Sequence, residues 1–303
     1  MENTVLKSEA ICVIFLMFVG ALMNAQGQSP PEPVDIRPVE IMHMGNGVTT
    51  GISDREQKGR QVLNQCSEAH GWIRGSSRIV STKYVDDWSV APEQLRPYNN
   101  WPNLKQELQH DFLSFRLGNS KVTLLKGTAK DEVWGIHNNV PYKIINGDIG
   151  KVDDPNMIPA LVGKEYFIQL PYWIKKVPIA VHVKDTVLNN KTYHLVFGTW
   201  KTLKANDNFD QYIYWINKKT KLLEIVQYTV RVVDPRAAGF VVFDDFRKVD
   251  RIVVPFAHRL GYLPTRDGLI HEMRFHSIVL DPKGISPSDI QQLKSKDLPF
   301  DLN

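Results

Sequence analysis

The side chains best suited to bind a metal ion or to transfer a proton are dispersed along this 303-residue chain. Among its nine histidines, His182 and His194 flank a predicted hairpin, and Asp185 falls roughly opposite His194. Two imidazoles and a carboxylate at short range are a ligand set that transition metals accept. Polar residues that face each other across exposed strands give the same pattern without a metal, and this is the interpretation we favour. We therefore predict no metal site and no cofactor.

Signatures of the common catalytic classes do not occur in the sequence. It contains no G-x-S-x-G, no H-E-x-x-H and no Walker loop. General acid–base catalysis uses two carboxylates in one pocket. The acid pairs at 86–87, 153–154 and 244–245 are adjacent, and neighbouring residues on a strand face opposite sides. Glu224, an acid among apolar residues, is interpreted as a strand-end carboxylate that reaches solvent or a lysine such as Lys218. We expect no catalytic residues and a non-enzymatic protein.

The elements that must position these residues are predicted to be mostly strands. Alternating apolar patterns separated by turn residues indicate roughly ten strands in meander order. Ser53 and Glu56 form a capping box that begins a helix, and Gly71 ends it. Residues 155–174 predict a second helix that runs until Pro171. The fold class is α+β, mainly β: a large curved antiparallel sheet, or incomplete barrel, with helices covering its open side.

Finer expectations concern the connections between these elements. Residues 89–105 are interpreted as a polar insertion, with a short helix near 103–110. Residues 132–144 are predicted to be one strand, and Asn189-Asn190 to be a hairpin turn. A closing helix is expected at 286–293.

One hairpin carries more apolar residues than its place in a half-exposed sheet would require. It spans residues 210–230, DQYIYWINKKTKLLEIVQYTV, and both of its faces are apolar. A strand with one wet face should alternate apolar and polar residues. Both faces must therefore be covered, either by packed core as in a sandwich or by a core on one side and a ligand cavity inside the curved sheet on the other.

The N-terminal sequence predicts export. Residues 10–23, AICVIFLMFVGALM, are apolar over a length that suits a signal peptide better than a membrane span. We assign residues 1–27 to a signal peptide, 28–52 to a Pro/Gly-rich arm or linker, and 53–303 to a single domain. The mature protein is expected to be soluble and periplasmic or secreted.

Charge and cysteine content narrow the class of protein further. The formal net charge of +4 is spread along the chain, which argues against a nucleic-acid partner. After signal removal only Cys66 would remain, so no intrachain disulfide can form and the fold must rely on its core.

Three stretches resemble the LolA/LolB-like superfamily of periplasmic lipoprotein carriers, and more closely an uncharacterised group of exported bacterial proteins allied to it. They are KEYFIQLPYWI at 164–174, YWINKKTKLLEIVQY at 214–228 and FDDFRKVDRIVVP at 243–255. The resemblance implies an incomplete antiparallel barrel plugged by helices, with an apolar cavity that takes lipid acyl chains. The arm and the insertion near 89–110 depart from the carriers, which leaves the cargo open.

We expect the ligand-binding side chains to be aromatic and aliphatic. They come from the strands and from the covering helix, and they are Phe167, Trp173, Phe197, Tyr212, Tyr214, Val226, Tyr228 and Phe243. The predicted function is a carrier or sensor of a lipid or acylated ligand in the cell envelope, with an envelope protein as a further partner. Two alternatives are a structural or interaction module with a filled core and an exported enzyme without a recognisable motif.

Overall fold

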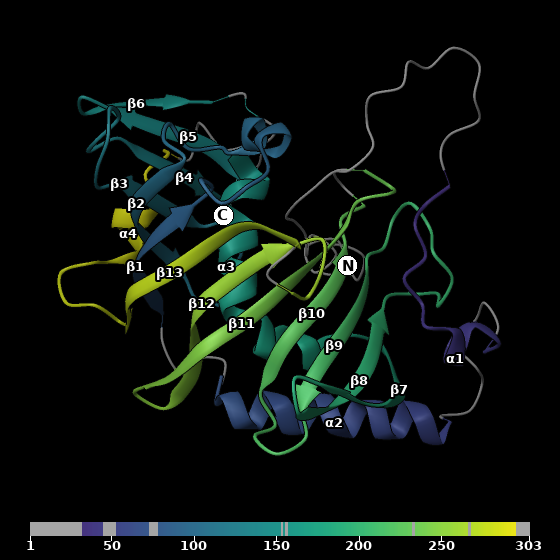
Figure 1. Ribbon diagram of the computed structural model, residues 1–303. Helices are drawn as coiled ribbons and strands as arrows, with labels where there is room; N and C mark the ends of the chain where they lie inside the picture. Colours follow the sequence, from purple (N-terminus) through teal and green to yellow (C-terminus); the bar gives the residue numbers. More distant parts are fainter. Residues whose placement is uncertain are drawn as a thin grey trace, which may run out of the picture.

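A single open antiparallel sheet dominates the molecule (Figure 1). The computed structural model describes residues 32–44, 53–72, 78–152, 154, 157–231, 234–265 and 268–294. Within these residues the sheet holds thirteen strands, where the sequence predicted roughly ten. Strands β6 and β7 form its two edges, so the barrel is incomplete. The predicted fold class is confirmed.

Two meanders make up the sheet. The first contains β1 (Ile79–Asp87), β2 (Lys105–Leu113), β3 (Ser120–Leu124), β4 (Val133–His137), β5 (Val140–Ile145) and β6 (Asp148–Lys151). The second contains β7 (Ile179–Leu188), β8 (Lys191–Thr199), β9 (Gln211–Asn217), β10 (Leu223–Thr229), β11 (Ala238–Val249), β12 (Ile252–Gly261) and β13 (Leu269–Leu280). The two meanders join in the middle of the sheet, where β13 pairs with β1.

Helices pack against both faces of the sheet. They are α1 (Val39–Met42), α2 (Asp54–His70), α3 (Met157–Trp173) and α4 (Pro287–Ile290), with 3-10 turns η1 (Glu93–Tyr98) and η2 (Ile174–Lys176). Helix α2 begins with the predicted capping box between Ser53 and Glu56 and ends at Gly71, whose φ is 73°. It packs beneath β7 and β8.

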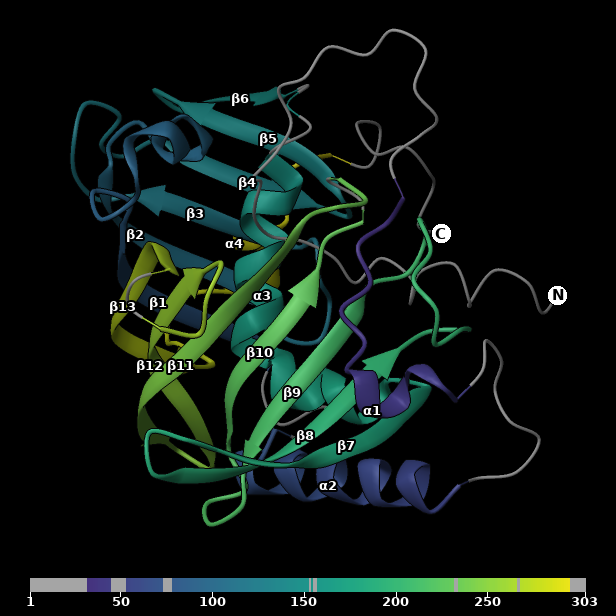
Figure 2. The ribbon, with the colours of Figure 1, turned by 45° about the vertical axis from the view of Figure 1, so that its right-hand side comes forward.

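Helix α3 crosses the concave face because the chain must travel from one edge of the sheet to the other. It follows the edge strand β6 and precedes the opposite edge strand β7 (Figure 2). A helix that is apolar on all sides belongs in the interior, and most described side chains of α3 are buried. The predicted end at Pro171 is wrong, since the helix continues to Trp173.

The hairpin of β9 and β10 contributes to a separate core on each face. Tyr214 pairs with Val226 and Tyr212 with Tyr228, and all four lie in the large core that surrounds α3. Ile213 belongs to a second core on the outer face. The two apolar faces of the sequence are therefore each covered by a different part of the chain.

Residues 32–44, the described part of the predicted arm, form a strap over the outer face of β7–β10 (Figure 2). Val34 N–H donates to the carbonyl oxygen of Pro235 at 2.9 Å, and Ile36 N–H donates to the Gln211 side chain at 2.9 Å. Ile41 is fully buried in the outer core. The strap covers the apolar cluster on this face of the sheet.

Two local predictions are wrong. The stretch at 103–110 does not form a helix, because residues from Lys105 belong to β2, which pairs with β1 along its whole length. Residues 132–144 form two strands, β4 and β5, which turn at Asn138 and Asn139 with φ of 48° and 64°. The closing helix α4 spans only part of the predicted range.

The assigned signal peptide, residues 1–27, lies outside the described residues. In the part of the chain that the structure describes, no helix has both the length and the apolar character needed to cross a bilayer.

Candidate binding site in the concave interior

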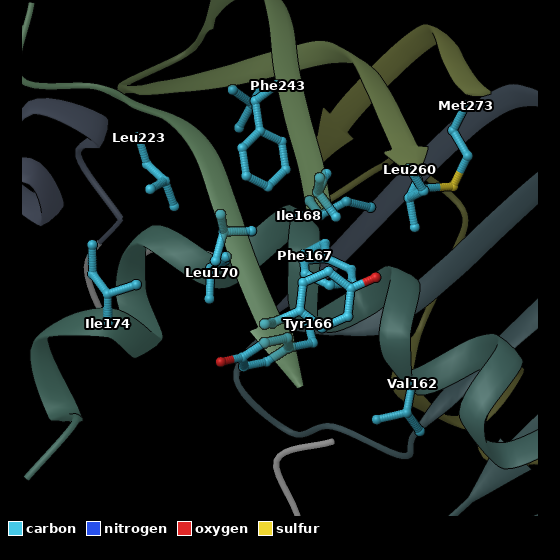
Figure 3. Close-up of a cluster of buried hydrophobic side chains, with 14 of the residues drawn as sticks. Val162, Tyr166, Phe167, Ile168, Leu170, Ile174, Leu223, Phe243, Leu260 and Met273 are labelled. Carbon is cyan, nitrogen blue, oxygen red and sulfur yellow. The ribbon is translucent and has the colours of Figure 1, made fainter. Parts of the chain in front are cut away.

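Aromatic side chains from α3 and from the sheet meet on the concave side. Phe167 contacts Tyr228 with ring centroids 5.2 Å apart and Phe243 at 6.5 Å. Tyr212 stacks on Tyr214 at 5.7 Å. Figure 3 shows Phe243 and Leu223 on the strands facing the side chains of α3. We call these rings the aromatic lining between the helix and β9–β11.

The structure brings seven of the eight predicted ligand-binding residues to this interior. Six are buried in the core around α3: Phe167, Tyr212, Tyr214, Val226, Tyr228 and Phe243. Trp173, near the end of the helix, is partly buried against the same core.

Phe197 lies apart from the other seven, on the outer face of the sheet. It is fully buried in the core beneath the strap and pairs with Val181 and Ile213. Its neighbour Val196 pairs with Tyr214 and faces α3 instead. Side chains alternate between the two faces along a strand, so an error of one residue places a side chain on the wrong face. The sequence prediction made this error when it put Phe197 on the same face as Tyr212.

A buried polar group next to the lining was not predicted from the sequence. Asp86 accepts hydrogen bonds from His271 Nδ1 and Trp101 Nε1, both at 2.8 Å, and its Oδ2 lies 3.3 Å from Lys164 Nζ. All four side chains are buried, and Trp88 stacks on His271 at 4.3 Å. The signal in the sequence was Lys164 inside a largely apolar helix, because a buried charge needs a buried counter-charge.

The electrostatics of this group favour one ion pair with a neutral imidazole. Burial alone would raise the pKa of Asp86, but Lys164 and His271 outweigh it and hold that pKa below its ordinary value. Burial lowers the pKa of Lys164, and Asp86 opposes this shift. Burial also lowers the pKa of His271. With three donors on its carboxylate, Asp86 is arranged to hold α3 rather than to exchange protons with a substrate.

Two further polar residues of α3 bind the backbone of the loop after β2. Gln169 Oε1 accepts from Phe115 N–H at 2.7 Å, and Glu165 Oε2 accepts from Gly118 N–H at 3.2 Å. Burial raises the pKa of Glu165 to about 8, so the carboxyl is largely protonated at neutral pH. The helix is thus attached to β1–β3 by polar contacts and meets β9–β11 through aromatic rings.

Histidines connect the aromatic lining with the polar group. His258 contacts Phe243 at 5.0 Å and Phe275 at 4.9 Å. Burial lowers the pKa values of His258 and His110 to about 3, so both rings are neutral at physiological pH. The interior therefore has an aromatic part and, beside it, neutral histidines that lead to the Asp86–Lys164 ion pair.

Glu224 lies outside this interior. A bulge in β10 separates it from the regular pairing, and its carboxylate binds Lys191, the Tyr193 hydroxyl and Asn217, each at 2.8 Å. The partner lysine is Lys191 rather than Lys218. These three bonds explain an acid in an apolar hairpin as an anchor between neighbouring strands.

No family model matches the sequence, and no curated protein matches it either. Solved structures match at low identity. A DUF1329 family protein from Desulfovibrio piger is 11% identical, with a TM-score of 0.53, and the match covers 79% of this chain and 98% of that one. An outer-membrane lipoprotein-sorting protein domain from Vibrio parahaemolyticus is 10% identical, with a TM-score of 0.50 and coverage of 78% and 97%.

A LolA superfamily protein from Nitrosomonas europaea is 9% identical, with a TM-score of 0.46 and coverage of 74% and 94%. At these identities the likeness concerns the architecture of the chain. The two matches with TM-scores of 0.50 or more show that the chain shares the overall fold of the Desulfovibrio and Vibrio proteins, an open antiparallel sheet with a helix across its concave face.

Proposed function

We propose that the chain is an exported, non-enzymatic binding protein that accommodates a lipid or acyl chain between α3 and strands β9–β11. The aromatic lining formed by Phe167, Tyr228 and Phe243 is the observation that carries this proposal. Apolar contacts are non-directional, so an acyl chain can replace part of a ring–ring contact at small cost. Such a protein acts in the cell envelope as a carrier or sensor.

The unequal attachment of α3 supports this position for the ligand. Its polar residues Lys164, Glu165 and Gln169 bind β1 and the loop after β2. Those bonds need specific partners, and breaking a buried ion pair costs about 3–5 kcal/mol. When a ligand enters, the aromatic contacts between α3 and β9–β11 therefore separate first. The polar contacts with β1 and the loop after β2 keep the helix in its position.

The neutral histidines beside the aromatic lining suit a ligand with a polar end. His258 touches Phe243 of the lining and lies in the same buried region as His271. The Vibrio domain that shares this fold is named for lipoprotein sorting. Acylated proteins and lipids are therefore the ligands to examine first.

The direct experiment is native mass spectrometry of the mature protein purified from its own envelope, followed by solvent extraction and lipid analysis. We expect a co-purifying acyl lipid, and uptake of a fluorescent fatty acid by the delipidated protein. A protein that arrives bare and takes up no fatty acid contradicts the proposal.

A matched pair of isosteric substitutions tests the position of the ligand. Val226 and Val181 are both fully buried, on the inner and outer faces respectively. A threonine adds a buried hydroxyl at either position, at about 1–3 kcal/mol. We expect Val226→Thr to weaken fatty-acid binding about tenfold, which corresponds to 1.4 kcal/mol.

Val181→Thr should lose similar stability, measured by urea unfolding, and bind the fatty acid like the wild type. Equal affinities in the two variants would place the ligand elsewhere.

An interaction module with a filled core is the second candidate. It is favoured by the burial of most described α3 side chains, because the helix itself occupies the concave side. In that case the mature protein carries no lipid, and pull-downs from the envelope recover a protein partner.

A further inference from the structure

The edge strand β7 carries a bulge that gathers two histidines and an aspartate. His182 pairs with Val196, and Asp185 pairs with His194, as the sequence predicted for the second pair. Residues 182 and 185 would face opposite sides of a regular strand because they are three apart. The extra residue, Val183, turns Asp185 to the same side as His182. Three potential ligands thereby converge on one spot.

The distances are close to those of a coordination sphere. His194 Nδ1 lies 2.7 Å and His182 Nε2 lies 3.1 Å from the same Asp185 oxygen, Oδ1. All three ligand atoms lie within 4.8 Å of one another. Zinc binds nitrogen and oxygen at about 2.0–2.2 Å, so the ligands of a tetrahedral site lie roughly 3.3 Å apart. The two distances to Asp185 are slightly shorter than this spacing, and the two imidazole nitrogens lie no more than 4.8 Å apart, so a cation can enter after rotations of these side chains.

The protonation states suit metal binding. Burial lowers the pKa values of His182 and His194, against the opposing effect of Asp185, so both rings are neutral at physiological pH. Burial would raise the pKa of Asp185, but hydrogen bonds from Lys218, His194 and His182 outweigh it and lower that pKa. A neutral imidazole and an ionised carboxylate are the forms that bind a metal.

The lysines around the cluster determine which oxygen of the Asp185 carboxylate is left for the two histidines. Lys218 binds Asp185 Oδ2 at 2.6 Å and leaves Oδ1 to the two imidazoles. Lys58 of α2 and Lys221 of the β9–β10 turn also act on the histidines, and both favour the neutral rings. Without a metal, each ring directs an N–H at Oδ1. On metal binding that proton moves to the other ring nitrogen, and the freed nitrogen becomes the ligand.

We propose that His182, Asp185 and His194 bind a divalent transition cation of the zinc class. Two nitrogens and one oxygen match the preference of zinc, and three protein ligands leave a fourth position for water. The Asp185 side chain is 35% exposed, so the cation has access from solvent. The cation would join the two strands of the β7–β8 hairpin at its bulge. This inference is independent of the interior ligand.

Zinc titration of the full mature chain, purified without a histidine tag, tests the proposal by calorimetry. We expect one zinc ion per chain. His182→Ala and His194→Ala should each weaken binding more than about 100-fold, beyond the 10–100-fold that follows loss of a supporting partner. Cobalt in place of zinc should give visible absorption bands in the wild type that both variants lack. His276→Ala, which removes an exposed histidine of β13, is the matched control and should bind like the wild type.

Lys218→Met keeps the test decisive even if a histidine variant fails to fold. Removing this cation should tighten zinc binding, because Lys218 competes with the metal for the charge of Asp185. Any one of three results would overturn the proposal: no zinc binding, equal binding in His182→Ala and His276→Ala, or an unchanged affinity in Lys218→Met. The cluster would then be an ion-pair network that protects the edge strand.

Discussion

A single histidine joins the last turn of α2 to two strands. The Nδ1 atom of His70 donates to the carbonyl oxygen of Val253 at 2.7 Å, and its Nε2 atom accepts from Leu223 N–H at 3.0 Å. The ring can do both only when it is neutral. Burial lowers its pKa to about 4, from an ordinary value of 6.5.

His70 therefore makes stability depend on pH in a defined window. Between pH 4 and 6.5 the unfolded chain binds the proton and the folded chain does not, so stability rises with pH and is lost on acidification. From pH 7 to pH 5 this residue should cost about 2 kcal/mol in the free energy of unfolding. His70→Gln should lose less stability over the same range, measured by urea unfolding. His276→Gln, at an exposed position, should retain the wild-type loss, and identical pH profiles in all three proteins would contradict the role of His70.

Side-chain alternation was enough to predict which residues of β9 and β10 share a face, but it gave no sign of the polar group around Asp86. Tyr212, Tyr214 and Tyr228 share a face because they are separated by even numbers or paired across the hairpin. Asp86 was considered only as part of an adjacent acid pair, since its partners Lys164 and His271 come from α3 and β13, which only the fold brings near. Contacts between residues so distant in sequence leave no periodic signal.

At the scale of the element, the strap shows how a segment with little regular structure can complete a core. It contributes Ile41 to the outer core beside Val181 and Phe197. Sequence composition indicated a linker, because its prolines and glycines lack periodicity. Its role depends on hydrogen bonds to β9 and to the loop before β11, which composition does not reveal.

Ile41→Asp should release the strap. Burying an isoleucine contributes about 1.5–3 kcal/mol, and a carboxylate cannot occupy the same apolar site. We expect faster proteolytic cleavage within residues 32–44 and stronger binding of a hydrophobic dye to the uncovered face. Val39→Asp changes a neighbour that is 75% exposed and should behave like the wild type. A strap that stays protected in Ile41→Asp would show that its backbone hydrogen bonds hold it alone.

The strand count was underestimated because two asparagine turns were overlooked. Asn138-Asn139 carries the same signal as Asn189-Asn190, and both pairs adopt positive φ. Asn146-Gly147, the strongest short turn signal, joins β5 to β6. The long helical expectation for α3 was nearly correct because its apolar run is too long for a strand.

At the scale of the whole molecule, an open sheet must protect its edges. The edge strand β6 is exposed at all four residues and includes Ile149, while Asp148 and Lys151 carry its charges. Charged side chains discourage pairing between the edges of two copies. The opposite edge, β7, is interrupted by its bulge.

Replacing both Asp148 and Lys151 by threonine should allow β6 strands of two molecules to pair. We expect concentration-dependent dimers or larger species in sedimentation velocity, with the wild type remaining smaller at the same concentration. Lys83→Thr removes an exposed charge from the central strand β1 and should not change association. If both proteins sediment alike, the charges on β6 are not what keeps the edge apart.

The pairing of β1 with β13 governs when the protein can fold during synthesis. Val80 lies opposite Leu280, so the central seam of the sheet closes only after nearly the whole domain has been made. Until then β1 pairs only with β2 and forms an open edge of the first meander, and α3 has only part of its sheet to pack against. Contacts of such long sequence separation slow folding and extend the exposure of apolar surface. Because β1 and β13 pair late, the newly made chain stays unfolded for longer. An unfolded polypeptide is narrow enough to pass through a channel that the folded sheet could not enter.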